Sequence, residues 1–280
     1  LKAVVLAAGL GERLKPLTNT LPKHLMPVLG RPLLHRILSH LDALGLEEII
    51  VVVSYLKERI LSSLLKLRLK AKVKPVNQVS KKGTAAALLS AKPYLKGEFL
   101  VVYGDIFTSM QALSAVAEQE ADAVGVVKVA DPWNYGVVRI NASGYLLDVV
   151  EKPPPGREPS NLVLAGIYKF SHEILNYLES VPPSPRGEYE LTDAIRLMAR
   201  DGFAVKCVKV DRWADVGRPH DLLRANALAL TEALGVEGVA LMGLDVRIGT
   251  GVTIIPPVFI GDNCVVEKGC KIGPFTCLGS

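Results

Sequence analysis

The feature that most constrains the fold is a short apolar run near the start of the chain that leads directly into a glycine-rich segment. Residues 4–6 (Val-Val-Leu) have the character of a buried parallel strand. Two glycines follow, Gly9 and Gly11, which allow positive φ angles and leave amide N–H groups facing outward, where they can bind an anion. Arg13 and Lys23 add positive charge. We therefore expect a phosphate-binding loop at the carboxyl end of the first strand.

The two commonest phosphate-binding motifs do not match this loop. A dinucleotide-binding fingerprint requires a third glycine three positions after Gly11, where this chain has Leu14. A Walker A loop requires Gly-Lys-Ser/Thr, which is absent after the glycines. Taken alone, Gly-x-Gly is equally compatible with a plain tight turn, so the assignment depends on the flanking residues.

Beyond this loop, helical and strand-like segments alternate along the chain. The predicted helices are residues 33–44 and 57–69, and the predicted strands are residues 49–53, 73–76 and 99–106. This alternation is typical of a doubly wound α/β fold, in which ligands bind at the carboxyl ends of the strands. Asp105 lies at such an end, where its carboxylate could either hold Mg²⁺ or cap the following turn.

The residues after the glycines extend the motif. The pattern Gly-x-Gly-x-Arg-Leu-x-Pro-x-Thr over residues 9–18, followed by Pro-Lys at 22–23, resembles the signature loop of the sugar-1-phosphate nucleotidyltransferases. The resemblance implies the nucleotide-diphospho-sugar transferase fold, with a Rossmann-like, doubly wound mixed sheet. It implies transfer of a nucleotidyl group from UTP or dTTP to glucose 1-phosphate or N-acetylglucosamine 1-phosphate, with release of pyrophosphate. The alternatives are a mannose-1-phosphate guanylyltransferase and a catalytically silent regulatory subunit that binds a sugar nucleotide.

The resemblance also implies roles for individual residues. Those expected to bind the nucleotide are Ala7, Ala8, Gly9, Leu10, Gly11, Glu12, Gln78, Gly83 and Thr84. Those expected to bind the sugar phosphate are Tyr103, Gly104, Gly136, Glu151, Lys152 and Leu164. Those expected to be catalytic are Arg13, Lys23 and Lys152, and those expected to bind Mg²⁺ are Asp105 and Asp215.

Several of these positions have a purely structural alternative. Gln78 could be a surface residue beside a helix cap, Glu151 and Lys152 an edge ion pair, and Asp215 the cap of a turn. The resemblance favours the functional role in each case, with Gln78 pairing the edge of a uracil or thymine base. Relatives that act on N-acetylglucosamine 1-phosphate commonly carry asparagine where this chain has Leu164, which argues against an N-acetyl sugar.

The last part of the chain has a different sequence pattern, a repeat with a period of six residues. An aliphatic residue recurs at Ile248, Ile254, Ile260, Val266, Ile272 and Leu278, and a second, mostly small residue recurs between them. This resembles the hexapeptide repeat of a left-handed parallel β-helix. We therefore predict a catalytic domain over residues 1–229, a helical linker over 230–244 and a β-helix of about two coils over 245–280. The uncapped repeats lead us to expect a longer native chain or a homo-oligomer.

Composition argues against nucleic-acid binding, a membrane span and a cysteine metal site. The net charge of +5 is modest, and its main basic run, residues 66–74, alternates with apolar residues as in an edge strand rather than a nucleic-acid groove. No apolar run is long enough to span a bilayer, and a cytoplasmic location follows by default. The four cysteines have no metal-binding spacing and are expected to be buried free thiols.

Overall fold

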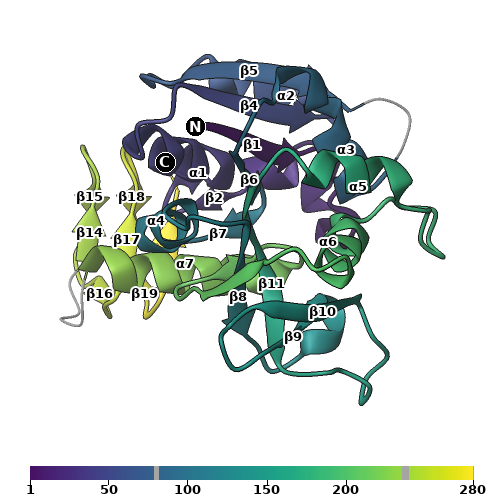
Figure 1. Cartoon of the computed structure of the whole chain (residues 1–280). Helices are drawn as coiled ribbons and strands as arrows, with labels where there is room; N and C mark the ends of the chain where they lie inside the picture. Colours follow the sequence, from purple (N-terminus) through teal and green to yellow (C-terminus); the bar gives the residue numbers. More distant parts are fainter. Residues whose placement is uncertain (79–81, 235–239, 280) are drawn as a thin grey trace.

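The first predicted strand lies in the middle of a nine-stranded sheet (Figure 1). The computed structural model describes residues 1–78, 82–234 and 240–279. In it, β1 (Lys2–Ala7) pairs in parallel with β4 (Glu48–Val53) on one side and with β6 (Phe99–Tyr103) on the other. All residues of β1 after the first are buried, as the apolar run predicts.

The two halves of the sheet differ in strand direction. β5 (Lys72–Asn77) pairs in parallel with β4 and forms one edge, so the end of the basic run, residues 72–74, lies in an edge strand, whereas residues 66–71 do not. On the other side of β6, β11 runs antiparallel and makes the sheet mixed. This second half consists of β8 (Ala123–Lys128), β9 (Gly136–Ile140), β10 (Leu146–Glu151), β11 (Leu162–Phe170) and β12 (Lys206–Lys209).

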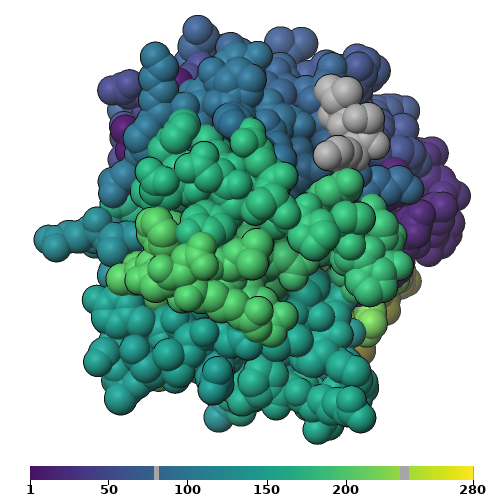
Figure 2. Space-filling model, turned by 45° about the vertical axis from the view of Figure 1, so that its right-hand side comes forward, coloured from purple at the N-terminus to yellow at the C-terminus, as the bar shows by residue number. Residues whose placement is uncertain are grey.

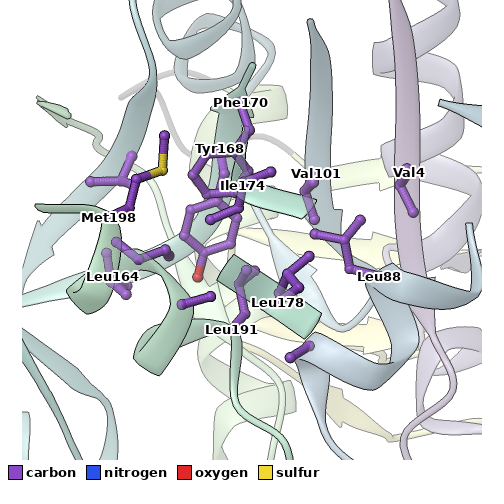
Figure 3. Packing of buried hydrophobic residues seen from close by; sticks show 14 of the residues in the cluster. Val4, Leu88, Val101, Leu164, Tyr168, Phe170, Ile174, Leu178, Leu191 and Met198 are labelled. Atoms are coloured by element: carbon purple, nitrogen blue, oxygen red, sulfur yellow. The ribbon is translucent and has the colours of Figure 1, made fainter. Parts of the chain in front are cut away.

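Helices cover both faces of the sheet, each over its own apolar core. One face is covered by α3 (Thr84–Ser90), α5 (Ile174–Ser180) and α6 (Leu191–Arg200). The other is covered by α1 (Leu33–Ala43), α2 (Lys57–Leu64) and α4 (Met110–Ala117). On the first face, Tyr168 belongs to one buried cluster with Leu88, Leu178 and Leu191 (Figure 3). The predicted α/β class is therefore confirmed.

Segments that are distant in sequence interleave on the surface. In the space-filling view, green residues from later in the chain separate the blue residues of its first part from the teal residues near its middle (Figure 2). Such interleaving is expected where one sheet is built from non-consecutive strands, since β1 lies between β4 and β6.

Two predicted boundaries were wrong. The helix expected over residues 57–69 ends at Leu64. The strand expected over residues 99–106 ends at Tyr103, since residues 104–105 form a turn after the last bond of the β1–β6 ladder, from the N–H of Gly104 to the carbonyl of Leu6 at 2.9 Å. After this break, β7 (Ile106–Phe107) pairs with β13 (Ala214–Asp215) in a separate small sheet.

The C-terminal segment forms short strands that pair only in parallel. Ala240 of β14 pairs with Val258 of β17, and Val258 pairs with Thr276 of β20, an advance of 18 residues each time. This register equals three repeats of six. The strands are β14 (Ala240–Met242), β15 (Arg247–Ile248), β16 (Thr253–Ile254), β17 (Val258–Ile260), β18 (Val265–Val266), β19 (Lys271–Ile272) and β20 (Thr276–Leu278).

A single helix, α7 (Pro219–Leu234), precedes these strands and runs unbroken through the predicted boundary at residue 229. Residues 235–239 of the predicted linker, and Ser280, lie outside the described residues. Within the described part of the chain, no helix combines the length and apolar character required to cross a membrane. The expectation of buried thiols holds only for Cys207, since Cys270 is exposed and the other two cysteines are half-buried.

A histidine is buried beneath the loop edge of the sheet. His24 is 1% exposed and lies in a short 3-10 helix, Lys23–Leu25, with its Cδ2 atom against Gly104. Its Nδ1 atom has no hydrogen-bond partner among the described residues. Burial, together with the charge of Lys23, lowers the pKa of His24 from its ordinary value of 6.5 to about 3, so the folded protein holds it neutral.

This burial predicts a loss of stability in mild acid. Above pH 6.5 His24 is neutral in both states, but below it the unfolded chain gains a proton that the folded protein does not take up until about pH 3. Between pH 7 and pH 5 this should remove roughly 2 kcal/mol from the free energy of unfolding. Urea titrations at both pH values should show that His24→Gln reduces this loss.

The matched control is His172→Gln, at an exposed histidine. This variant should keep the wild-type difference between the two pH values. An equal pH dependence in wild type and in His24→Gln would contradict the prediction.

Candidate active site

Four charged side chains predicted to act together converge at the carboxyl ends of β1 and β6. Arg13 and Lys23 come from the segment after β1, Asp105 from the turn after β6, and Asp215 from β13. The pairing of Ile106 with Asp215 in the small β7–β13 sheet brings the two aspartates together. In that pairing, the N–H of Val216 donates to the carbonyl of Asp105 at 2.9 Å.

Of the two glycines expected to allow positive φ, Gly11 adopts a left-handed conformation and Gly9 does not. Gly11 has φ 69°, and its carbonyl accepts hydrogen bonds from the N–H of Leu14 at 3.0 Å and from the hydroxyl of Thr18 at 2.8 Å. The segment after it is only a three-residue 3-10 helix, Glu12–Leu14. Ala7 is the buried last residue of β1, whereas the side chain of Leu10 is 41% exposed. The loop therefore presents backbone to the ligand edge.

The same glycines make room for Lys23. A Cβ atom at Gly9 would lie 2.7 Å from Cε and 2.9 Å from Nζ of Lys23. A Cβ atom at Gly11 would lie 3.2 Å from Cβ of Lys23 and 2.9 Å from Cγ2 of Thr18. Contacts below 3.0 Å require something to shift, so the lysine stem and the loop backbone fit together only without side chains at these positions.

The amine of Lys23 forms an ion pair with Oδ2 of Asp105, with side chains only 18% and 12% exposed. Burial alone would lower the pKa of Lys23, but the charges of Asp105 and Asp215 outweigh it and hold the pKa above its ordinary value. Conversely, burial alone would raise the pKa of Asp105, and Lys23 holds it below its ordinary value. Both groups are charged at neutral pH.

Asp215 is in a different electrostatic state. Burial, followed by the negative charge of Asp105, raises the pKa of Asp215 to about 7, against the opposing effects of Lys23 and Arg13. Arg13 lies beside this aspartate, since a Cβ atom at Gly217 would lie 2.8 Å from Nη2 of Arg13 and 3.2 Å from Oδ2 of Asp215. Asp215 does not cap α7: Asp221 accepts the N–H groups of Gly217 and Arg218.

The aspartate pair fits a divalent cation. In residues 1–78, 82–234 and 240–279, no three His, Cys, Asp or Glu side chains are grouped to hold a metal ion by themselves. Two carboxylates suit Mg²⁺, which keeps several waters and takes other ligands from substrate phosphates. Because the proximity of Asp105 contributes to the raised pKa of Asp215, a cation between the two carboxylates would oppose that shift.

A second polar cluster lies at the carboxyl end of β10. Oε2 of Glu151 accepts a hydrogen bond from the hydroxyl of Thr192 at 2.8 Å, and its Oε1 lies 3.3 Å from Nζ of Lys152. Gly136 pairs with Glu151 across the β9–β10 ladder, where a Cβ atom would lie 3.2 Å from both Leu164 and Thr192. Lys152 has φ 44°, a strained backbone angle for a residue with a side chain.

Arg186 is a residue of this cluster that the sequence analysis missed. Its Nη2 atom lies 2.7 Å from Oε1 of Glu190 and 3.8 Å from Oε1 of Glu151. Burial, followed by the charge of Glu151, raises the pKa of Glu190. Arg186 comes directly before the Gly-Glu-Tyr-Glu-Leu-Thr-Asp segment, so that segment was the available signal for it.

The residues predicted to bind the base contact the segment that carries Glu190. Nε2 of Gln78 donates to the carbonyl of Gly83 at 3.3 Å, and Thr84 Oγ1 lies 3.3 Å from Oε2 of Glu190. Gly83 has φ 110°, and a Cβ atom there would lie 2.2 Å from the carbonyl oxygen of Tyr189. The structure therefore joins Gln78, Gly83 and Thr84 to the segment that carries Glu190.

Tyr103 is the last residue of β6, two positions before Asp105. Its ring packs edge-on against Tyr168, with centroids 5.6 Å apart, and over Gly166, where a Cβ atom would come within 2.9 Å of it. Burial and the neighbouring Tyr168 raise the pKa of Tyr103, so the phenol stays protonated. Of the remaining predicted residues, Ala8 is half-buried and Glu12 is exposed.

Comparison with known proteins places the chain among curated relatives. It is 37% identical over 274 residues to "Bifunctional protein GlmU" of Methanococcus aeolicus, and 37% identical over 278 residues to "Bifunctional sugar-1-phosphate nucleotidylyltransferase/acetyltransferase" of Sulfurisphaera tokodaii. Each match covers 97% of this chain but only 62% and 65% of the relative. It is also 38% identical to "UTP--glucose-1-phosphate uridylyltransferase AglF" of Haloferax volcanii, over 79% of this chain and 93% of that protein.

Solved structures give the same placement. A structure titled as UDP-glucose pyrophosphorylase complexed with UDP-glucose matches with a TM-score of 0.70 and 26% identity, over 82% of this chain and 98% of that one. UDP-glucose pyrophosphorylase from Acinetobacter baumanii matches with a TM-score of 0.69 and 25% identity, over 84% and 95% of the two chains. The sequence profile described as nucleotidyl transferase matches residues 2–232, and the chain belongs to this nucleotidyl transferase family.

Proposed function

We propose that this chain transfers a nucleotidyl group from UTP or dTTP to a sugar 1-phosphate and releases pyrophosphate. The observation that carries the proposal is the convergence of Arg13, Lys23, Asp105 and Asp215 at the carboxyl ends of β1 and β6. Two cations and two carboxylates at one sheet edge suit a reaction between two anionic substrates. The names of the uridylyltransferase relative and of the pyrophosphorylase structures favour UTP and glucose 1-phosphate as the pair.

In this reaction, a phosphate oxygen of the sugar 1-phosphate attacks the α-phosphorus of the triphosphate. A new P–O bond forms, the bond from the α-phosphorus to the bridging oxygen breaks, and pyrophosphate leaves with its electrons. Positioning and charge neutralisation provide the catalysis, so no protein nucleophile is required. The backbone of residues 8–11 and the side chain of Arg13 hold the triphosphate, and Lys23 neutralises charge at the reacting phosphorus.

Asp105 and Asp215 would hold Mg²⁺ at this edge. When bound, the ion supplies charge stabilisation at the phosphoryl oxygens and orients the triphosphate. The amine of Lys23 pairs with Asp105 in this structure, and its stem lies against the glycine loop, so it would contact a triphosphate bound by that loop.

The cluster around Glu151 would bind the sugar 1-phosphate. Glu151 accepts hydrogen bonds from sugar hydroxyls, and Thr192 fixes its orientation. Lys152 and Arg186, both near Oε1 of Glu151, provide positive charge for the sugar phosphate. The apolar Leu164, which would contact a side chain at Gly136, gives an N-acetyl group no hydrogen bond, and this favours glucose 1-phosphate.

For the C-terminal segment, we propose a left-handed parallel β-helix over residues 245–280. The supporting observations are the period of six residues and the parallel register of 18 residues. The interior is formed by Val258, Ile260, Val266 and Ile272. The domain boundaries at 229 and 244, a homo-oligomer formed through this segment and a cytoplasmic location stay predictions.

A substrate panel tests the reaction. Pyrophosphate release should be measured with each of four nucleoside triphosphates and with the 1-phosphates of glucose, glucosamine, N-acetylglucosamine and mannose. We expect the fastest release with UTP or dTTP and glucose 1-phosphate. Preference for GTP with mannose 1-phosphate would identify a guanylyltransferase. Binding of a sugar nucleotide without release from any pair would identify a silent binding subunit.

Arg13→Ala should lower kcat by about tenfold or more, because a charged contact to the transferring phosphates is lost. The matched control is Arg59→Ala, which removes an exposed arginine of α2 outside the site. Steady-state kinetics should show wild-type turnover for the control. Near-normal kcat for Arg13→Ala would refute its assigned role.

Glu151→Gln should raise the KM for the sugar 1-phosphate by roughly tenfold, since hydrogen bonds to a charged acceptor are stronger than those to a neutral one. The KM for the nucleoside triphosphate should change much less. Glu120→Gln, at an exposed position just before the start of β8, serves as the control. An equal rise in both KM values would argue against a sugar-specific role for Glu151.

A further inference from the structure

The segment that carries Lys23 continues into a tight hairpin. β2 (Pro27–Val28) and β3 (Arg31–Pro32) are joined by Leu29 and Gly30, which have φ angles of 49° and 67°. Positive φ at both central residues is the geometry of a two-residue hairpin turn that usually contains asparagine or glycine. Leucine disfavours this conformation, so contacts from the surroundings must hold the turn in place.

Three different parts of the chain supply those contacts. Oδ1 of Asn226 in α7 accepts the N–H of Leu29 at 3.0 Å. Nε of Arg36 in α1 donates to the carbonyl of Val28 at 3.1 Å. From the C-terminal repeats, the ring of Phe259 lies so close to Gly30 that a Cβ atom there would be 3.1 Å from Cε1 and 3.2 Å from Cζ.

Phe259 occupies an outward position on the repeats. Its neighbours in β17, Val258 and Ile260, are 0% exposed and point into the repeat interior. Side chains alternate along a strand, so Phe259 points the other way, toward the catalytic region. Leu241 and Cys277 are its partners in β14 and β20, and all three side chains are half-buried. In Figure 1, β14 and β17 lie at the C-terminal end of α7.

The hairpin also packs against the elements that carry the charged residues of the candidate site. Lys23–Leu25 directly precedes it, and the N–H of Leu33 after the hairpin donates to the carbonyl of Met26 at 3.1 Å. A single buried cluster joins the hairpin to residues within three positions of each charged group of the site. Its members are Leu14, Met26, Val28, Leu33, Phe107, Ala214, Val216, Ala225 and Ala229.

We propose that Phe259 is a positioning residue for nucleotidyl transfer, acting from the C-terminal repeats through the Leu29–Gly30 turn on Lys23. In this way the repeats keep the side chain of Lys23 in position against Asp105 and the glycine loop. The inference rests on the proposed function for its kinetic consequence, but its structural part, the ordering of residues 23–32 by Phe259, does not depend on the substrate.

The test compares Phe259→Ala, Phe259→Leu and Phe275→Ala in the full chain. Phe275 lies in the same repeats but is 54% exposed, so it controls for loss of a phenylalanine there. For Phe259→Ala we expect roughly a tenfold lower kcat with less than a twofold change in either KM, because a misplaced catalytic group slows the reaction itself. Phe259→Leu, which keeps apolar contact with the turn, should recover most of the loss.

Hydrogen–deuterium exchange provides the second readout. Peptides covering residues 23–32 should exchange several-fold faster in Phe259→Ala than in wild type, while peptides from β4 and β5 should not change. Phe275→Ala should match wild type in both regions. This pattern is specific to positioning, since general destabilisation would accelerate exchange in β4 and β5 as well.

Wild-type kcat and unchanged exchange over residues 23–32 in Phe259→Ala would overturn the inference. Faster exchange confined to the repeats would overturn it too, as would faster exchange in β4 and β5 of Phe259→Ala, because the lower kcat would then reflect general destabilisation. If the wild type releases no pyrophosphate from any substrate pair, the proposed function fails instead, and the exchange comparison still decides whether Phe259 orders the lysine segment.

Discussion

The ion pair between Lys23 and Asp105 is the interaction on which the candidate site depends. Both side chains are largely buried, and removing one partner of such a pair leaves an uncompensated charge at a cost of about 3–5 kcal/mol. The pair therefore fixes the end of β6 against the segment after β1. Its geometry requires Gly9 and Gly11, which leave room for the lysine stem, and Gly104, which lets the turn approach Leu6. Three glycines therefore make room for the ion pair between Lys23 and Asp105.

Asp215 reaches this pair through backbone pairing rather than through a local motif. Its strand, β13, pairs with β7, the short strand that begins directly after Asp105. Asp221 caps the following turn, which leaves the carboxylate of Asp215 available at the ligand edge. The result is a second buried carboxylate whose pKa is raised to about 7, by burial and by proximity to the first. That shared environment is where a divalent cation would be most strongly stabilised.

The sequence predicted the features that depend on local patterns. Strand β1, the loop at Gly11, the edge position of β5 and the six-residue period of the C-terminal strands all follow from composition and spacing. Contacts between distant segments could not be predicted in this way. The bond from Thr192 to Glu151 and the approach of Arg186 to Glu151 depend on where α6 and the segment before it pack against β10. The turn after Tyr103 leads into β7, which pairs with β13 from more than 100 residues later in the chain.

The missing third glycine has a structural consequence. In dinucleotide-binding folds, the phosphate lies at the N-terminus of a long helix, whose dipole contributes positive charge. Here the loop leads into only a three-residue 3-10 helix, Glu12–Leu14. Leu14, the last residue of this helix, stands where the fingerprint has its third glycine, and it is completely buried. A single short turn has little dipole, so the positive charge must come from side chains. This explains why Arg13 and Lys23 are both present, and why carboxylates that hold these cations in place are built into the same sheet edge.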